Sequence, residues 1–178
     1  MKELSIGIDD DLYFYLELLE KTLFIKSKEE VVKKSLTLFK DLGMHDWMPN
    51  LYRIGSSRVI IMERGMLLDI FELLTEHETY RAGTLTAMER KMLKPEFRDI
   101  NLTKPANGMI VLKELQNLGW GVFTKTDKEI KVENSAVPTN YLRGHLETMF
   151  KVEMGEHQTK VEGLVILIAG ESKLDAWL

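Results

Sequence analysis

The stretch that decides the fold of the first part of the chain covers residues 3–43 and reads ELSIGIDDDLYFYLELLEKTLFIKSKEEVVKKSLTLFKDLG. Its first six residues alternate between polar or small side chains and apolar ones, which predicts a half-buried strand. Asp9 follows as a predicted helix N-cap. Leucines at spacings of four, three and four residues then predict the apolar stripe of a helix, at Leu12, Leu16, Leu19 and Leu23.

A second helix is predicted to begin after Ser27. The order Ser27-Lys28-Glu29-Glu30 is that of a capping box, in which hydroxyl and carboxylate each accept a hydrogen bond from a free amide. Gly43 is the expected residue just beyond the end of this helix. One strand and two short helices cannot bury their apolar faces within a single copy of about 43 residues, and a lone strand has two unpaired edges. We therefore expect a homodimer in which two strands pair antiparallel.

Strand, helix, short turn and capped helix at these lengths resemble the ribbon-helix-helix family of DNA-binding proteins. The resemblance implies an intertwined dimer whose paired strands enter the major groove of double-stranded DNA. It also implies that the free amides at the start of the second helix hold a DNA phosphate. Transferred to this sequence, the expected DNA-binding residues are Lys2, Glu3, Ser5, Gly7, Ser27, Lys28 and Glu29.

The negative charge of the chain is unfavourable for tight DNA binding. The formal net charge is −4, and residues 1–43 carry seven lysines, no arginine and nine acidic residues. Glu3 is able to accept a hydrogen bond from cytosine but repels phosphate, while Ser5 and Gly7 offer only a hydroxyl and a hydrogen atom. The alternative is that the ribbon only dimerises the protein.

The bulk composition narrows the class of protein. With 178 residues, 44% of them hydrophobic and 29% charged, the sequence is that of a folded protein of one or two domains. No apolar run approaches the roughly 18 to 20 residues of a membrane span, and the first residues do not form a signal peptide. The chain has no cysteine, which excludes disulfides and thiolate metal sites. We expect a cytoplasmic protein without metal or cofactor.

Periodicity is lost between Gly43 and Gly55, and Pro49 lies within this segment. The sequence therefore predicts a first domain over residues 1–43, a linker over 44–55 and a second domain over 56–178. In the second domain, helical spacing appears over residues 66–74, 80–94 and 109–118, with Leu85, Met88 and Met92 as the apolar stripe of the middle helix. Strands are predicted over 120–126, 129–133 and 158–169, with a helix over 140–153 before the last. This order indicates an α+β domain with a helical layer on an antiparallel sheet.

Residues 115–163 read LQNLGWGVFTKTDKEIKVENSAVPTNYLRGHLETMFKVEMGEHQTKVEG, and this run resembles the core of the 4-vinyl reductase domain. The same fold occurs in haem-based nitric oxide sensors and in TRAPP tethering subunits. The resemblance implies an apolar cavity between helices and sheet that binds a small uncharged ligand. The cysteines of related metal-binding members are missing, and no histidine matches the haem ligand.

Methionine and aromatic side chains are the candidates for lining such a cavity, because methionine adapts to varied shapes. The alternative is that they form ordinary core, and that His145 is satisfied by a neighbour. Gly144 is expected to permit close packing of its helix on the sheet. The candidate ligand-binding residues are Met88, Met92, Trp120, Phe123, Tyr141, His145, Met149 and Phe150.

No catalytic motif accompanies these features. The sequence has no nucleophile elbow or phosphate loop, and Gly119-x-Gly121 lies where a helix enters a strand, the wrong order for a dinucleotide fingerprint. We therefore expect a protein that is not an enzyme. The predicted function is a homodimeric DNA-binding transcriptional regulator whose second domain senses a small apolar ligand. The alternative is a dimeric interaction scaffold whose second domain binds a protein partner.

Overall fold

The structure is a computed structural model, and it describes residues 5–54, 57–94, 97, 100–102, 104–126, 129–157 and 159–170. The chain divides into two compact units, Met1–Ile54 and Gly55–Leu178, which are described here one at a time. Lys2 and Glu3, two of the expected DNA-binding residues, lie outside the described residues.

The first unit contains two helices of the expected lengths. At the start of the first, the Leu12 amide donates to Asp9 Oδ1 at 2.8 Å, as predicted for an N-cap. Gly43 follows the second helix in the left-handed conformation, with φ of +60°. Residues 5–9 belong to neither helix nor strand within the single chain. The elements of this unit are α1 (Asp10–Lys21), α2 (Lys28–Asp41), a 3₁₀ turn (Met44–Asp46) and β1 (Tyr52–Ile54).

Only half of the capping box predicted at Ser27 forms. The Glu30 amide donates to Ser27 Oγ at 3.2 Å, but the Glu30 carboxylate pairs with Lys34 at 2.7 Å, one turn further along α2. A complete box lies in the second unit, where Thr75 and Glu78 each accept from the other's amide. Because an acidic residue at this position has two possible partners, the motif alone does not decide which one it takes.

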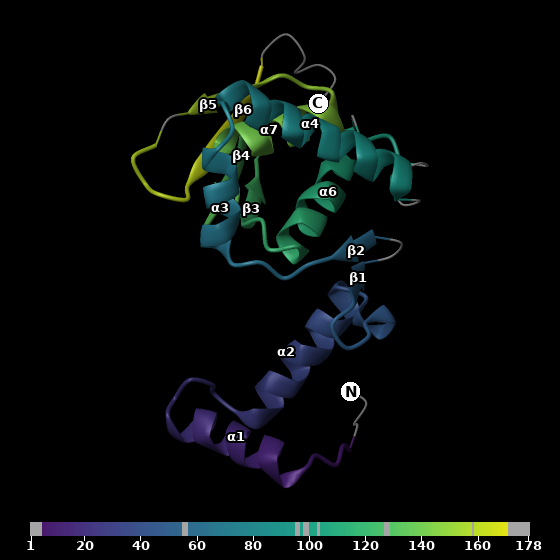
Figure 1. The fold of residues 1–178 in the computed structure, drawn as a ribbon, viewed down its shortest axis with the longest axis vertical. Coiled ribbons are helices and arrows are strands. Elements are labelled where there is room, and N and C mark those ends of the chain that lie inside the picture. The colour runs from purple at the N-terminus through teal and green to yellow at the C-terminus, as the bar shows by residue number, and fades with distance from the viewer. Residues whose placement is uncertain are drawn as a thin grey trace. The chain divides into compact units, whose positions relative to one another are not determined.

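The second unit is an α+β fold, as the sequence predicts (Figure 1). Four of its strands form an antiparallel sheet in the order β3-β4-β6-β5. The elements are β2 (Ser57–Val59), α3 (Arg64–Glu72), α4 (Glu76–Leu93), α6 (Pro105–Asn117), β3 (Val122–Lys125), β4 (Glu129–Glu133), α7 (Thr139–Phe150), β5 (Met154–His157) and β6 (Val165–Ala169).

The strand predicted over residues 158–169 is confirmed only at its end, where β6 forms, and its predicted length is wrong. A strand that was not predicted, β5, lies just before this range and pairs antiparallel with β6. Gly163, with φ of +72°, lies in the connection between them. In β5 only Met154 is buried, so the alternation that normally identifies a strand is absent.

The core of the second unit lies between the sheet and its helices. Strand residues of β4 and β6 at alternate positions, Ile130, Val132, Val165 and Leu167, are almost fully buried. Their cluster includes side chains of α6 and α7, among them Leu112, Leu115, Leu142, Leu146 and Phe150. This is the helical layer on an antiparallel sheet that the periodicity predicts.

Helices α4 and α7 approach each other closely at a pair of glycines. A Cβ atom added to Gly83 would lie 2.1 Å from the Tyr141 carbonyl oxygen, and one added to Gly144 would lie 2.1 Å from the Tyr80 carbonyl oxygen. Each helix therefore presents a glycine to the backbone of the other. Gly144 does permit close packing, as predicted, but its close neighbour is α4 and not the sheet.

The apolar stripe predicted on α4 lies on the exposed face of that helix. Leu85, Met88 and Met92 are 56%, 49% and 64% exposed. The buried face carries small side chains instead, at Thr79, Gly83 and Ala87. Small residues allow the close contact with α7, so backbone proximity and not side-chain bulk decides which face of α4 is buried.

Among the described residues, no helix combines the length and the apolar character that crossing a membrane requires.

Candidate functional site

The described part of the first unit leaves much of its apolar surface exposed. Among the described residues of this unit, Leu16 is the one apolar residue that is buried. Large side chains on both helices and the turn between them are exposed, among them Leu12, Tyr13, Phe14, Leu18, Leu23, Phe24, Leu36, Leu38 and Phe39. A folded helix pair with so much exposed apolar surface is typical of one half of a larger interface.

The residues expected to face DNA from the strand are only partly described. Ser5 and Gly7 are exposed, and nothing lies within 4 Å of a Cβ atom added to Gly7. Ile6 and Ile8, on the other side of the expected strand, are 55% and 42% exposed. In the single chain both sides of this segment are therefore open.

The start of α2 brings together the other three expected DNA-binding residues. Ser27 caps the helix, and Lys28 Nζ lies 3.1 Å from Glu20 Oε2 and 5.0 Å from the centre of the Tyr13 ring, so that it links α2 to α1. The hydrogen bond with Glu20 raises the pKa of Lys28. Hydrogen bonds from its own amide and from Ser27 lower the pKa of Glu29. A phosphate bound here would compete with Glu29 for the helix amides.

A surface hollow of about 450 Å³ runs along α2. It is lined by charged residues of both signs together with one threonine and one leucine, at Glu30, Lys33, Lys34, Thr37, Leu38 and Asp41. Such a lining is unsuited to an apolar small molecule, which binds in mostly apolar pockets.

The eight predicted ligand-binding residues occupy three different environments in the second unit. Met88 and Met92 are on the exposed face of α4. Phe123, Met149 and Phe150 are buried, and all three belong to the main core cluster. Trp120, Tyr141 and His145 are in direct ring contact. The structure therefore brings together three of the eight as one group.

We name the group formed by Phe71, Trp120, Tyr141 and His145 the aromatic cluster. The Trp120 ring centre lies 5.3 Å from that of Tyr141 and 5.0 Å from that of His145. The Phe71 ring packs edge-on against Tyr141 at 4.9 Å. Tyr141 also donates its hydroxyl to Thr86 Oγ1 at 2.9 Å, which fixes the phenol against α4. The cluster thus joins α3, α4, α7 and the segment before β3.

His145 is the most unusual member of the aromatic cluster, because it is fully buried. Its two ring nitrogens make no hydrogen bond to any residue that the structure describes. Burial, together with the positive charge of Arg90, lowers the pKa of His145 to about 3; the nearby Gly83 carbonyl opposes this shift. At neutral pH the imidazole is therefore uncharged and holds one donor and one acceptor, neither of which has a well-formed hydrogen bond to a described residue.

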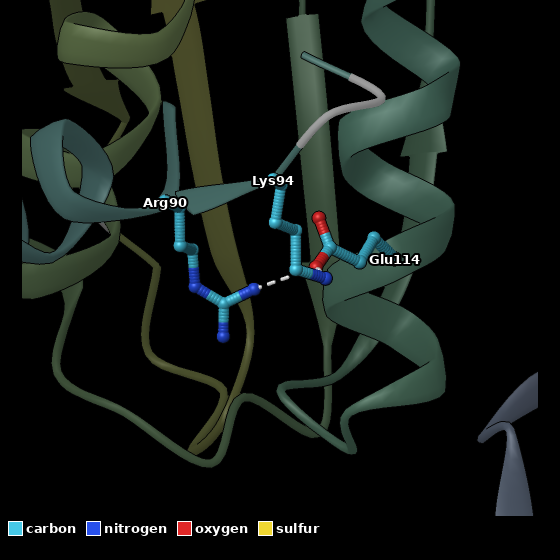
Figure 2. Close-up of polar contacts among 3 residues, drawn as sticks. All are labelled: Arg90, Lys94 and Glu114. Carbon is cyan, nitrogen blue, oxygen red and sulfur yellow. Dashed lines mark hydrogen bonds and ion pairs between the residues drawn. The ribbon is translucent and has the colours of Figure 1, made fainter. Parts of the chain in front are cut away.

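A charged group borders the aromatic cluster. Arg90 Nη1 lies 2.9 Å from Glu114 Oε1, and Lys94 pairs with the same oxygen (Figure 2). The Arg90 guanidinium also lies 5.5 Å from the centre of the Trp120 ring. Glu114 Oε2 is buried and has no hydrogen-bond partner within the described part of the chain. Burial lowers the pKa of Arg90, but a guanidinium stays protonated at any pH at which proteins fold.

No sequence signal marks the Arg90–Glu114–Lys94 group or a hollow of about 310 Å³ in this unit. That hollow is lined by Arg64, Asn134, Ser135, Glu162 and Gly163. Arg64 and Ser135 are 71 positions apart, and Arg90 and Glu114 are 24 apart. No short sequence motif joins such pairs, and only the fold places them together.

No cluster of three or more histidine and carboxylate side chains that could hold a metal ion is present among the described residues. No family model matches this chain, and no curated protein and no solved structure matches it either.

Proposed function

We propose that this protein is a homodimeric, DNA-binding transcriptional regulator whose second unit senses a small, mostly apolar ligand. The observation that carries the proposal is the exposed apolar surface of the first unit, in which Leu16 is the one buried apolar residue described. Apolar surface gains roughly 25 cal/mol for each Å² removed from water. Covering it with a second copy therefore stabilises both copies.

The alternating sequence of the N-terminal segment supports the DNA-reading part of the proposal. Residues 3–8 alternate in polarity, and a strand formed here needs a partner for its backbone groups. Two copies paired antiparallel form a ribbon with Glu3, Ser5 and Gly7 on one face. A two-stranded ribbon fits the major groove of DNA, where base edges are distinguishable.

The start of α2 supports contact with the DNA backbone. Free amides at a helix N-terminus favour an anion, and Lys28 places a positive charge beside them. Lys28 also pairs with Glu20, so phosphate binding requires it to exchange one negative partner for another. Affinity for DNA is accordingly expected to be modest and strongly dependent on salt.

The aromatic cluster supports the sensing part of the proposal. It combines three aromatic rings with a neutral buried imidazole whose donor and acceptor are both free of partners among the described residues. Because His145 is fully buried, a planar ligand with one hydrogen-bonding group would have to displace packed side chains of the cluster to reach the imidazole and stack on Trp120. To regulate DNA binding, such a ligand must discriminate between two states of the dimer, by roughly 1 to 3 kcal/mol in typical coupled systems.

The alternative function is a dimeric scaffold in which the ribbon serves only for dimerisation. Two observations favour it: residues 1–43 carry more acidic than basic side chains, and Lys28 is already paired with Glu20. In this case the second unit binds a protein partner.

Binding to duplex DNA measured from about 50 to about 300 mM salt separates the two functions. A regulator loses affinity steeply as salt rises, and one sequence is enriched from a random pool. Deletion of residues 1–8 is expected to abolish binding. A well-folded dimer that does not bind DNA even at the lowest salt would contradict the regulator function and favour the scaffold.

A charge exchange gives a matched control for Lys28. Lys28→Glu alone removes the phosphate contact and also the pair with Glu20. Exchange of both residues, as Lys28→Glu with Glu20→Lys, restores an opposite-charge pair between α1 and α2 but leaves a carboxylate at the α2 N-terminus. If DNA contact is the role of Lys28, both variants lose DNA affinity. If its role is only to join the helices, the double exchange recovers affinity.

A further inference from the structure

Helix α4 presents to solvent a stripe that is both apolar and charged. At 100° per residue, Arg81, Leu85, Met88, Glu89 and Met92 fall within an arc of about 100°. All five are exposed, and the buried residues of the same helix lie on the opposite side. We name these five residues the α4 stripe.

The two charges of the α4 stripe are symmetrically placed about Leu85. Arg81 is four residues before it and Glu89 four residues after it, which places each charge about 6 Å from Leu85 along the helix axis. Neither side chain forms an ion pair or a hydrogen bond with another residue that the structure describes. At about 12 Å of rise they are too far apart to pair with each other within one helix.

From this geometry we infer that the α4 stripe is a second homodimer contact, in which α4 packs antiparallel on α4 of a second copy. A twofold axis through Leu85 places Arg81 of each copy opposite Glu89 of the other. The surface is thus complementary to itself, as an interface between identical copies must be. The Leu85 side chains meet at the centre, and Met88 covers the aliphatic part of Arg81 from the other copy.

The inference rests on the proposed dimer of the first unit. One helix pair of about 27 Å length covers less than the roughly 800 Å² per partner of a stable interface. Two second units joined through dimerised first units are held at millimolar effective concentration, at which a small contact suffices. The stripe therefore adds a contact to a dimer that already exists.

Cysteine cross-linking of the full chain tests the contact directly, because the protein contains no cysteine. Leu85→Cys places the only thiol of each copy at the twofold axis, within the roughly 4 to 7 Å between Cα atoms that a disulfide requires. The side chain is 56% exposed, so folding is expected to tolerate the change. Lys113→Cys, at an exposed position on α6, is the control.

The expected result under mild oxidation is a disulfide-linked dimer from Leu85→Cys, with a yield at least about tenfold above that of Lys113→Cys at equal concentration. Adding Arg81→Glu to Leu85→Cys is expected to lower the yield, and adding Glu89→Arg as well is expected to restore it. Recovery by exchange of the two charges is not expected of a random collision between copies.

Light scattering on the unoxidised proteins separates this inference from the proposed function. If Leu85→Cys is dimeric but cross-links no more than Lys113→Cys, the α4 contact is overturned while the dimer of the first unit stands. If Leu85→Cys cross-links in high yield, and Glu89→Arg restores the yield that Arg81→Glu lowers, the α4 contact is supported even when the protein does not bind DNA. A protein that is monomeric and does not cross-link overturns both.

Discussion

At the scale of single residues, His145 shows how the surroundings of a side chain set its chemistry. The imidazole is fully buried beside Arg90, and both influences disfavour its charged form. Its nitrogens make no well-formed hydrogen bond within the described residues, and the nearby Gly83 carbonyl compensates the desolvation of the ring only in part. A core position of this kind costs stability, as is frequent at binding sites.

Replacing His145 with leucine is predicted to flatten the dependence of stability on pH. The pKa of His145 is about 3 in the folded chain and near 6.5 when unfolded, so between these values the unfolded state binds one more proton. This contribution to stability is complete above pH 6.5 and is lost as the pH falls toward 3. The natural chain should lose up to about 1.4 kcal/mol more per pH unit than His145→Leu over this window. Urea unfolding at several pH values measures the difference.

The comparison with His157→Gln shows whether the effect belongs to the buried site, because His157 is exposed on β5. Parallel curves of stability against pH for the natural chain and His145→Leu would contradict a neutral buried imidazole. Both variants must first show the same folded circular dichroism as the natural chain at pH 7.

The sequence predicts candidate site residues only where they are rare, large side chains that lie close together in the chain. Trp120, Tyr141 and His145 are rare, large side chains in one segment, and the structure places them in contact. Met88 is also a large side chain, but it is exposed because of how α4 is oriented, and the sequence of α4 does not specify that orientation. Glu114 carries no local signal, because its partners are on another helix.

At the scale of elements, the crossing of α4 and α7 depends on the absence of two side chains. Gly83→Ala is predicted to destabilise the second unit by about 3 kcal/mol or more, because the new Cβ atom would lie 2.1 Å from a backbone oxygen that cannot rotate away. Gly144→Ala should have an effect of the same size by the same cause. Thermal unfolding of each variant measures the loss.

Gly108→Ala provides the matched control for these helix glycines. It also lies within a helix, but its added Cβ atom meets nothing closer than 3.7 Å, and only side-chain atoms. Alanine is favoured over glycine in helices by roughly 0.5 to 1 kcal/mol. Gly108→Ala should therefore be neutral or slightly stabilising. A similar loss in all three variants would show that close helix contact is not the cause.

The same crossing explains where prediction from periodicity succeeds and where it fails. The pattern identifies α4 as a helix, but it assigns the apolar stripe containing Leu85 to the buried face, which the structure contradicts. Hydrophobic periodicity detects bulky side chains, whereas the contact with α7 is made through Gly83 and Ala87. For β5, with one buried residue, the pattern contains no signal at all.

At the scale of the whole molecule, the two units differ in how much apolar surface each buries within a single chain. The second unit buries a continuous cluster of strand and helix side chains. The first unit forms capped helices, yet leaves most of its large apolar side chains exposed. Helices of 12 and 14 residues are marginal without tertiary packing. The first unit is thus expected to draw its stability from association.

Leu36→Lys is predicted to convert a dimeric protein into a monomer. Leu36 is 51% exposed in the single chain, so in a monomer the change would alter stability by no more than about 0.5 kcal/mol. In a dimer that covers this face, the same change buries a charge without a partner and costs several kcal/mol. Thr37→Lys is the control, because Thr37 is the next residue and is exposed and polar. Sedimentation should give twice the chain mass for the natural protein and for Thr37→Lys, and a single chain mass for Leu36→Lys. Equal masses for all three proteins would mean that the exposed face of α2 is not where two copies meet.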